Sequence, residues 1–108
     1  MLERDRLDAL LQELKAQLVR IYGDRLASLV LFGSVARGEA TDQSDIDILV
    51  VLHGEVSDRQ EIAATSHLIA RLSLEYGVTL SRIFAPAQRY LHERSPFFLN
   101  VRREGVKL

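Results

Sequence analysis

The sequence has 108 residues, of which 47% are hydrophobic and 27% charged, and its formal net charge is −1. Ordinary domains contain roughly 100 to 150 residues, so we expect one domain over residues 1–108. The near-average composition excludes a disordered chain, and the absence of cysteine excludes disulfides, thiolate metal sites and cysteine nucleophiles.

The first segment has the spacing of an amphipathic helix. Its apolar residues recur at i, i+3, i+4 and i+7 and Gly23 follows, which predicts a helix from Leu2 to Tyr22. The apolar positions are Leu7, Leu10, Leu11, Leu14, Leu18 and Ile21. This segment lacks a signal-peptide core, and no apolar run approaches the roughly 20 residues that span a bilayer. We therefore expect a cytoplasmic protein.

Two short apolar runs follow this helix. Leu26–Phe32 ends at Gly33, and Ile46–Leu52 is rich in β-branched residues and ends at His53 and Gly54. Runs of this length are too short for typical helices and are typical of largely buried strands. The sequence therefore predicts two strands separated by a loop.

The next segment predicts a crossover. Ser57 and Gln60 have the spacing of a capping box, and the following helical periodicity predicts a helix over Asp58–Tyr76. Strand-forming residues then predict a strand over Val78–Phe84. Because a helix of this length usually joins two parallel strands, we expect this strand to lie parallel to its predecessor.

The C-terminal segment predicts a short helix. Ser95 is suited to cap it, Pro96 to its first position and Gly105 to the position beyond its end. Its apolar residues are Phe97, Phe98, Leu99 and Val101. Two adjacent aromatic residues on one helix cannot both face one core, so we expect one of them to contribute to an interface.

The complete order predicts an α/β fold. It consists of a small three-stranded mixed sheet flanked by about four helices, one of them a short turn after Gly33. The charge is uneven along the chain: residues 1–81 carry 8 Lys and Arg against 13 Asp and Glu, whereas residues 82–108 carry 6 against 2. A near-neutral total argues against broad nucleic-acid binding, which needs many basic contacts to phosphates.

The loop after the first strand has features of a phosphate-binding turn. Free backbone N–H groups of Gly33 and Ser34, with the Ser34 hydroxyl, are suited to phosphate oxygens, and glycine allows a close approach. Arg37 lies on the same turn and could neutralise phosphate charge. A Gly-Ser pair alone is weak evidence, since most such pairs form plain turns, and arginines on loops are often only solvated.

Two aspartates begin the second strand. Asp45 and Asp47 are two residues apart and project to one face, while Ile46 and Ile48 project to the other. Neighbouring carboxylates repel each other, and a divalent cation removes this cost. Mg²⁺ commonly binds one or two carboxylates together with substrate phosphates. In isolation, the alternative that both are simply solvated remains open.

Together these motifs resemble the signature of the DNA polymerase beta nucleotidyltransferase superfamily, and most closely its small bacterial and archaeal members. The resemblance rests on Gly33-Ser34-x-Ala36-Arg37-Gly38, then on Ser44-Asp45-Ile46-Asp47 and the apolar strand that follows. The resemblance implies a catalytic and metal-binding role for Asp45 and Asp47. It also implies that Gly33, Ser34, Arg37 and Ser44 bind the nucleotide, with Mg²⁺ as cofactor and ATP or another NTP as substrate.

The resemblance further implies transfer of a nucleoside monophosphate, with AMP as the expected group, from the NTP to a hydroxyl acceptor. Small stand-alone members resemble the antitoxin of two-gene systems whose partner is a helical HEPN protein. We therefore expect such a partner, or a homo-oligomer, with the acceptor hydroxyl on the partner.

The sequence departs from the family pattern at one point. The family usually has a third carboxylate on the strand after the crossover helix, but residues 78–84 contain no acid, and Thr79 or Ser81 is expected at the matching face. A missing acid could be supplied by Glu39, by Asp42 or by a partner. The alternative function is a catalytically weak nucleotide- or partner-binding subunit that acts by occlusion.

Overall fold

The computed structural model describes residues 3–41 and 45–108. In chain order the helices are α1 (Arg4–Tyr22), α2 (Gly33–Ala36), α3 (Asp58–Tyr76), α4 (Ala87–His92) and α5 (Pro96–Glu104), with a 3-10 turn, η1 (Gly23–Arg25). The strands are β1 (Leu26–Phe32), β2 (Ile46–Leu52), β3 (Leu80–Pro86) and β4 (Val106–Lys107). No helix within these residues is long and apolar enough to cross a membrane.

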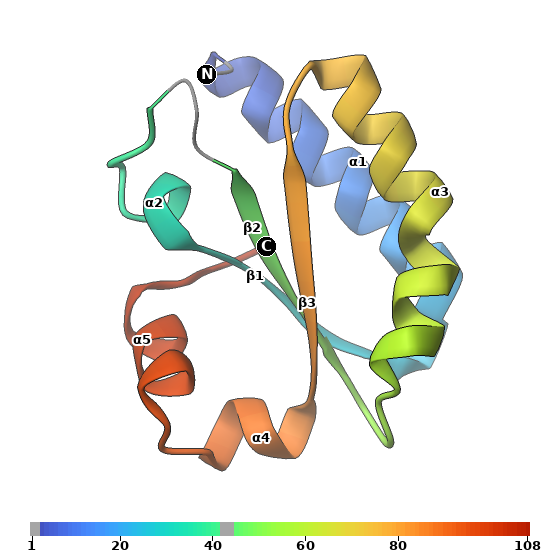
Figure 1. Ribbon diagram of the computed structural model, residues 1–108, viewed down its shortest axis with the longest axis vertical. Coiled ribbons are helices and arrows are strands. Elements are labelled where there is room, and N and C mark those ends of the chain that lie inside the picture. Colours follow the sequence, from blue (N-terminus) through green and yellow to red (C-terminus); the bar gives the residue numbers. More distant parts are fainter. Residues whose placement is uncertain (1–2, 42–44) are drawn as a thin grey trace.

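The sheet is mixed, with the strand order β3-β2-β1-β4. The strands β2 and β3 are parallel and are joined by α3, whereas β1 is antiparallel to both β2 and β4 (Figure 1). The predicted α/β class and the predicted parallel crossover are confirmed. The described residues form four strands, one more than predicted.

Helices cover both faces of the sheet. The helices α1 and α3 lie against one face, and α4 and α5 lie against the other (Figure 1). The short helix α2 lies at the end of β1, where Val35 and Ala36 pack against the cluster that contains α1. The alternation along β2 explains this arrangement, since Ile46, Ile48 and Val50 pack in the cluster that contains α1 and α3. Leu49 and Val51 pack instead against α4 and α5. Asp47 shares the face of Leu49 and Val51.

The capping box at the start of α3 differs in one partner from the predicted one. Ser57 accepts a hydrogen bond from the backbone N–H of Gln60, as expected at this spacing. The reciprocal acceptor for the Ser57 N–H is the Glu61 carboxylate, at 3.2 Å, and not the Gln60 side chain. Glu61 is 4% exposed, and its contact with Arg25 offsets its burial.

The bounds of one strand differ from the sequence prediction, and two elements were not predicted. The third strand begins at Leu80 and not at Val78, because Gly77 is left-handed and the Val78 N–H is bonded to Ser73, which closes α3. The helix α4 was not predicted. The strand β4 was also missed, since its two residues form a strand only by pairing with Val30 and Leu31 of β1.

Candidate functional site

The candidate site begins at the junction of β1 and α2. The strand ends at Phe32 in an extended conformation, and Gly33 has a φ of 76°, a value that favours glycine. One helical turn follows, in which the Gly33 carbonyl accepts a hydrogen bond from the Arg37 N–H at 3.2 Å. Gly33 and Ser34 therefore occupy the first turn of a helix, as the sequence indicated.

Asp47 lies directly against this turn. It pairs in register with Phe32 of β1, which places it beside the residue that precedes Gly33. A Cβ atom added at Gly33 would collide with the Asp47 carboxylate and would lie 3.2 Å from its Cγ. The absence of a side chain at Gly33 thus makes room for the acidic group. The two halves of the predicted motif meet in space.

The electrostatics of Asp47 are those of a group with unbalanced negative charge. Burial raises the pKa of Asp47 above its ordinary value, and the neighbouring charge of Asp45 raises it further. The Arg37 guanidinium acts in the opposite direction and lowers this pKa. Asp45 is exposed and immediately precedes β2. The pair is therefore close enough for mutual repulsion, with one cation nearby.

This donor set fits a divalent cation that is shared with a substrate. Within residues 3–41 and 45–108, no three His, Cys, Asp or Glu side chains are grouped so that they could hold a metal ion. Proteins nevertheless commonly coordinate Mg²⁺ through only one or two carboxylates, and water and substrate phosphates supply the remaining oxygen ligands. The raised pKa of Asp47 is consistent with this fit, because a cation would remove the repulsion that Asp47 experiences.

Arg37 is held at the mouth of the site by acidic partners. Its side chain is 42% exposed and lies 3.3 Å from a carboxylate oxygen of Glu39 and 3.7 Å from one of Glu104. Exposed ion pairs of this kind are weak, so a polyanion can replace them. The charge of Arg37 also acts on the Asp47 carboxylate, so the two groups lie near each other, and phosphate binding by Arg37 stays a prediction.

Ser81 occupies the register position beside Asp47 on the parallel strand β3. Thr79 precedes the strand, and its carbonyl accepts a hydrogen bond from the Ile46 N–H. Of the two residues expected at the position of the third carboxylate, the structure thus selects Ser81. Ser44 and Asp42, which the sequence also singled out, lie outside the described residues.

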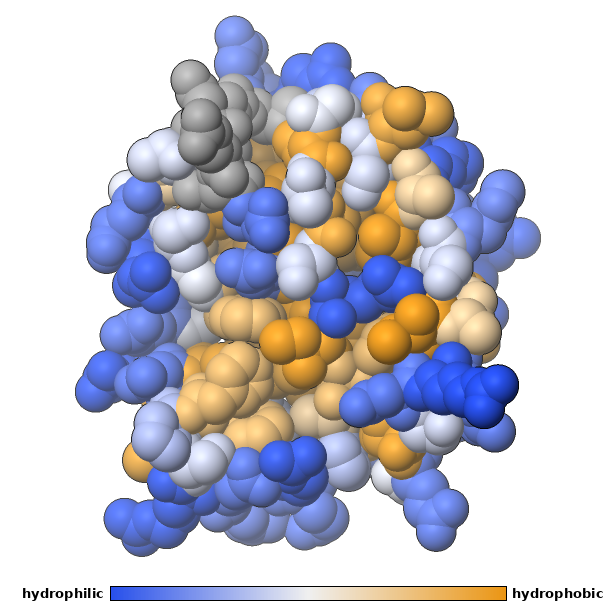
Figure 2. Space-filling model, viewed as in Figure 1, coloured by the Kyte–Doolittle hydropathy of each residue, from blue (hydrophilic) through white to orange (hydrophobic). Residues whose placement is uncertain are grey.

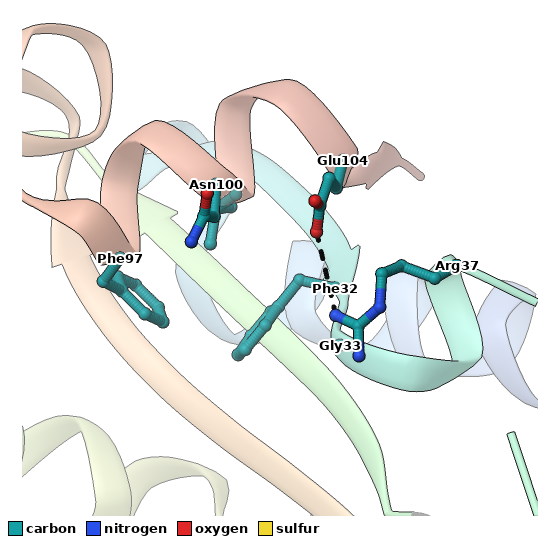
Figure 3. Close-up of a pocket in the computed structure, with 7 residues that line it drawn as sticks. Phe32, Gly33, Arg37, Phe97, Asn100 and Glu104 are labelled. Carbon is teal, nitrogen blue, oxygen red and sulfur yellow. Dashed lines mark ion pairs between the residues drawn. The ribbon is translucent and has the colours of Figure 1, made fainter. Parts of the chain in front are cut away.

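A pocket beside the turn contains residues that the sequence analysis did not place in the site. Its volume is about 250 Å³, and Gly33 and Arg37 form one wall (Figure 3). The other lining residues are Phe32, Phe97, Asn100, Val101 and Glu104. The four that belong to α5 have helical spacing, so they share one face of that helix. Periodicity could identify that face but could not show that it meets Gly33.

The adjacent aromatic residues differ in burial, although their rings contact each other edge to face with centroids 5.1 Å apart. Phe98 is 4% exposed and packs in the core with Leu49 and Val51. Phe97 lines the pocket, with its ring centroid 5.5 Å from that of Phe32 and nearly perpendicular to it. Phe97 therefore belongs to the wall of the candidate site.

Comparison with known proteins identifies similar chains. The model of the family described as "Nucleotidyltransferase domain" matches residues 11–94. A "putative protein adenylyltransferase" of Methanocaldococcus jannaschii is 38% identical over 85 residues, covering 78% of this chain and 79% of that protein. A second protein of the same organism and description is 32% identical over 74 residues, covering 68% and 74%.

Solved structures are similar over most of the chain. One, a "putative minimal nucleotidyltransferase", has a TM-score of 0.68 and 27% identity, and the match covers 99% of this chain and 97% of the other. Another, described as a toxin-antitoxin with AMP-PNP, has a TM-score of 0.57 and 22% identity, and covers 86% and 68%. At that identity the second match shows the fold alone.

Proposed function

The chain belongs to the nucleotidyltransferase domain family, and we propose that it transfers AMP from ATP, with Mg²⁺, to a hydroxyl group on a partner protein. The observation that carries this proposal is the contact of the Asp47 carboxylate with Gly33, beside Asp45 and Arg37. This contact brings the candidate cation ligands to the candidate phosphate turn. We further propose that residues 1–108 act as one nucleotidyltransferase domain.

Each residue has a proposed part in holding the triphosphate. The backbone N–H groups of Gly33 and Ser34 donate to phosphate oxygens, with the Ser34 and Ser44 hydroxyls as further donors. Arg37 exchanges its exposed carboxylate partners for phosphate charge. Asp45 and Asp47 hold Mg²⁺, which when bound supplies neutralisation of phosphate charge.

The reaction is an in-line displacement at the α-phosphorus. The acceptor hydroxyl oxygen forms a bond to this phosphorus, the bond to the bridging oxygen of the β-phosphate breaks, and pyrophosphate leaves. Positioning of the two oxygens in line with the phosphorus is the main contribution that protein residues make to such transfers. The hydroxyl proton passes to water or to an acceptor on the partner, since the Ser81 hydroxyl is a poor base near pH 7.

A protein acceptor is supported by two features. Relatives of this chain are described as protein adenylyltransferases, and similar folds occur in toxin-antitoxin structures, one of them with AMP-PNP. We propose a HEPN-type helical protein as the partner, in a toxin-antitoxin-like pair.

Transfer of radiolabel from ATP tests this proposal. With Mg²⁺ and the product of the neighbouring gene, label at the α-phosphate should pass to protein, whereas label at the γ-phosphate should leave with pyrophosphate. Asp45→Asn and Asp47→Asn should each reduce transfer by about 100-fold or more, because a catalytic cation is worth several kcal/mol. Asp24→Asn is the control, since Asp24 is exposed in η1 at the opposite end of β1. Transfer of the γ-label, or equal transfer by all three variants, contradicts the proposal.

Ser81 favours a second candidate function. Because β3 has Ser81 and not a carboxylate in register with Asp47, the chain could bind nucleotide and partner and act by occlusion, with little transfer. The same assay distinguishes the two: tight binding of ATP without α-label transfer and without pyrophosphate release supports occlusion.

A further inference from the structure

We propose that the pocket between α2 and α5 binds the nucleoside of the substrate and selects adenine, an inference that rests on the proposed function. The pocket shares Gly33 and Arg37 with the candidate triphosphate site. A ligand whose phosphates lie at this turn can therefore extend directly into the pocket. This continuity is the first step of the argument.

The walls of the pocket suit an aromatic ring. Phe97 and Phe32 contribute two rings in an edge-to-face arrangement, and Val101 adds an aliphatic surface. Nucleobases stack on exposed aromatic faces with a favourable energy that depends little on the base. Figure 2 shows that apolar surface, in orange and tan, gathers over α5 in the lower half of this side of the molecule and is surrounded by hydrophilic groups. A purine can cover part of this surface.

Three polar side chains line the pocket: Arg37, which the proposed function assigns to the triphosphate, and Asn100 and Glu104, which present one donor and one acceptor to the nucleoside. The Asn100 carbonyl oxygen accepts a hydrogen bond from Arg103 at 3.0 Å, which leaves the amide NH₂ as a free donor. In Figure 3 the Asn100 nitrogen is directed toward the side of the pocket that holds Phe97 and Phe32. Glu104 lies one helical turn further along α5, with its carboxylate 3.2 Å from Arg103 and 3.7 Å from Arg37. The remaining lone pairs of this carboxylate can only accept.

This pair matches one edge of adenine. Adenine presents an N7 acceptor beside an N6 amino donor, whereas guanine presents two acceptors, N7 and O6, at the same places. The Asn100 amide can donate to the ring nitrogen, and the Glu104 carboxylate can accept from the amino group. A carbonyl oxygen in place of that amino group would face the Glu104 carboxylate with no proton between them. The pocket therefore favours ATP over GTP and ITP.

Calorimetry with four probes tests this inference: ATP, GTP, ITP and inorganic triphosphate, each with Mg²⁺. Inorganic triphosphate reports the proposed triphosphate site alone, and the gain of ATP over it reports the pocket. Phe97→Leu and Asn100→Ala should each reduce ATP affinity by about tenfold and leave triphosphate affinity unchanged. Glu104→Gln should bring the ratio of ATP affinity to ITP affinity close to one. The substitution also removes the ion pair with Arg37, but this change affects both nucleotides alike and therefore cancels in the ratio.

Two variants serve as controls for position. Leu99 is exposed on α5 and does not line the pocket, so Leu99→Ala should bind all four probes as the wild type does. Ile83 is exposed on β3, in a separate pocket that shares only Phe97 with this one. Loss of ATP affinity with Ile83→Ala but not with Asn100→Ala would place the nucleoside along β3 and overturn the inference.

The outcomes separate this inference from the proposed function. If triphosphate and ATP bind equally well, the pocket does not hold a nucleoside, while the triphosphate site stands. If neither probe binds with Mg²⁺, the proposed function and the pocket assignment fall together. If ATP and ITP bind equally to the wild type, the selection of adenine is contradicted.

Discussion

The close approach of Asp47 to Gly33 is the contact on which the proposed site depends. Gly33 combines a φ of 76° with a neighbour that leaves no room for a Cβ atom. Gly38 has a similar φ of 73° but has no atom within 4 Å of the Cβ position. A comparison of alanine substitutions at the two glycines therefore separates the effect of backbone strain from the effect of the collision with Asp47.

Gly33→Ala should lower the free energy of unfolding and abolish Mg²⁺-dependent ATP binding. Gly33→Ala and Gly38→Ala should each lower the free energy of unfolding by roughly 1 to 2 kcal/mol, because alanine disfavours the left-handed conformation. Only Gly33→Ala must also displace the Asp47 carboxylate, so only this variant should lose ATP affinity. Urea denaturation and calorimetry on both variants check this expectation. Equal loss of ATP affinity in both would show that the Asp47 contact has no special role.

The raised pKa of Asp47 predicts a pH-dependent effect of Asp47→Asn without metal. Because the folded-state pKa lies above the unfolded value, this group contributes stability at pH below about 4 that is lost as pH rises through the folded-state pKa. Asp47→Asn should therefore stabilise the metal-free protein at pH 7, by roughly 0.2 to 1 kcal/mol as for exposed charge pairs. The gain should disappear near pH 3, as measured by urea denaturation. A destabilised variant at pH 7 would contradict the cost of the Asp47 charge, which arises from its burial and from the neighbouring Asp45.

Residue patterns predicted part of this site and not the rest. Gly33 and Asp47 were found because each belongs to a local motif whose two halves have a known separation. Asn100 and Glu104 were not found, because their role depends on how α5 packs against β1. Local periodicity defines the face of a helix, but it carries no information about which strand that face meets.

Among the elements, β3 determines what the site lacks. Its parallel register places Ser81 beside Asp47, so a carboxylate at this position would join the acidic pair. Thr79 lies before the strand, two residues earlier, and serves as the control. The sequence left these two residues open, because the start of β3 depends on the Gly77 turn that ends α3.

Ser81→Asp should raise the rate of nucleotidyl transfer by roughly 100-fold, the lower range for a positioned base. Thr79→Asp should leave the rate unchanged, since it lies outside the register with Asp47. Release of pyrophosphate measures both rates. A rise with Thr79→Asp alone would contradict the register, and fast transfer by the wild-type protein without a partner would show that no third acid is needed.

Across the whole molecule, segments far apart in the chain converge on one side of the sheet. The turn after β1, the start of β2 and the inner face of α5 all meet there, and β4 returns to pair with β1. Arg102 supports this arrangement by donating to the Tyr90 and Glu93 carbonyl oxygens, which joins α5 to α4.

The expected fold class and parallel crossover follow from patterns within single segments. The four-stranded sheet could not be predicted, because the two residues of β4 have no strand signal without β1. Phe98 is buried and Phe97 lines the pocket, but the two rings contact each other at 5.1 Å between centroids, and a contribution of Phe97 to an interface stays a prediction. A docking surface at the C-terminal segment, where the positive charge gathers, stays a prediction.

Calorimetry of ATP binding, with and without Mg²⁺, to the wild type and to the Asp45→Asn/Asp47→Asn double variant decides whether this site is the functional one. We expect Mg²⁺-dependent ATP binding by the wild type and none by the double variant. The variant should unfold at the same urea concentration or a higher one, because the repulsion between the two carboxylates is gone. Unchanged ATP and Mg²⁺ affinity in a folded double variant would contradict the assignment.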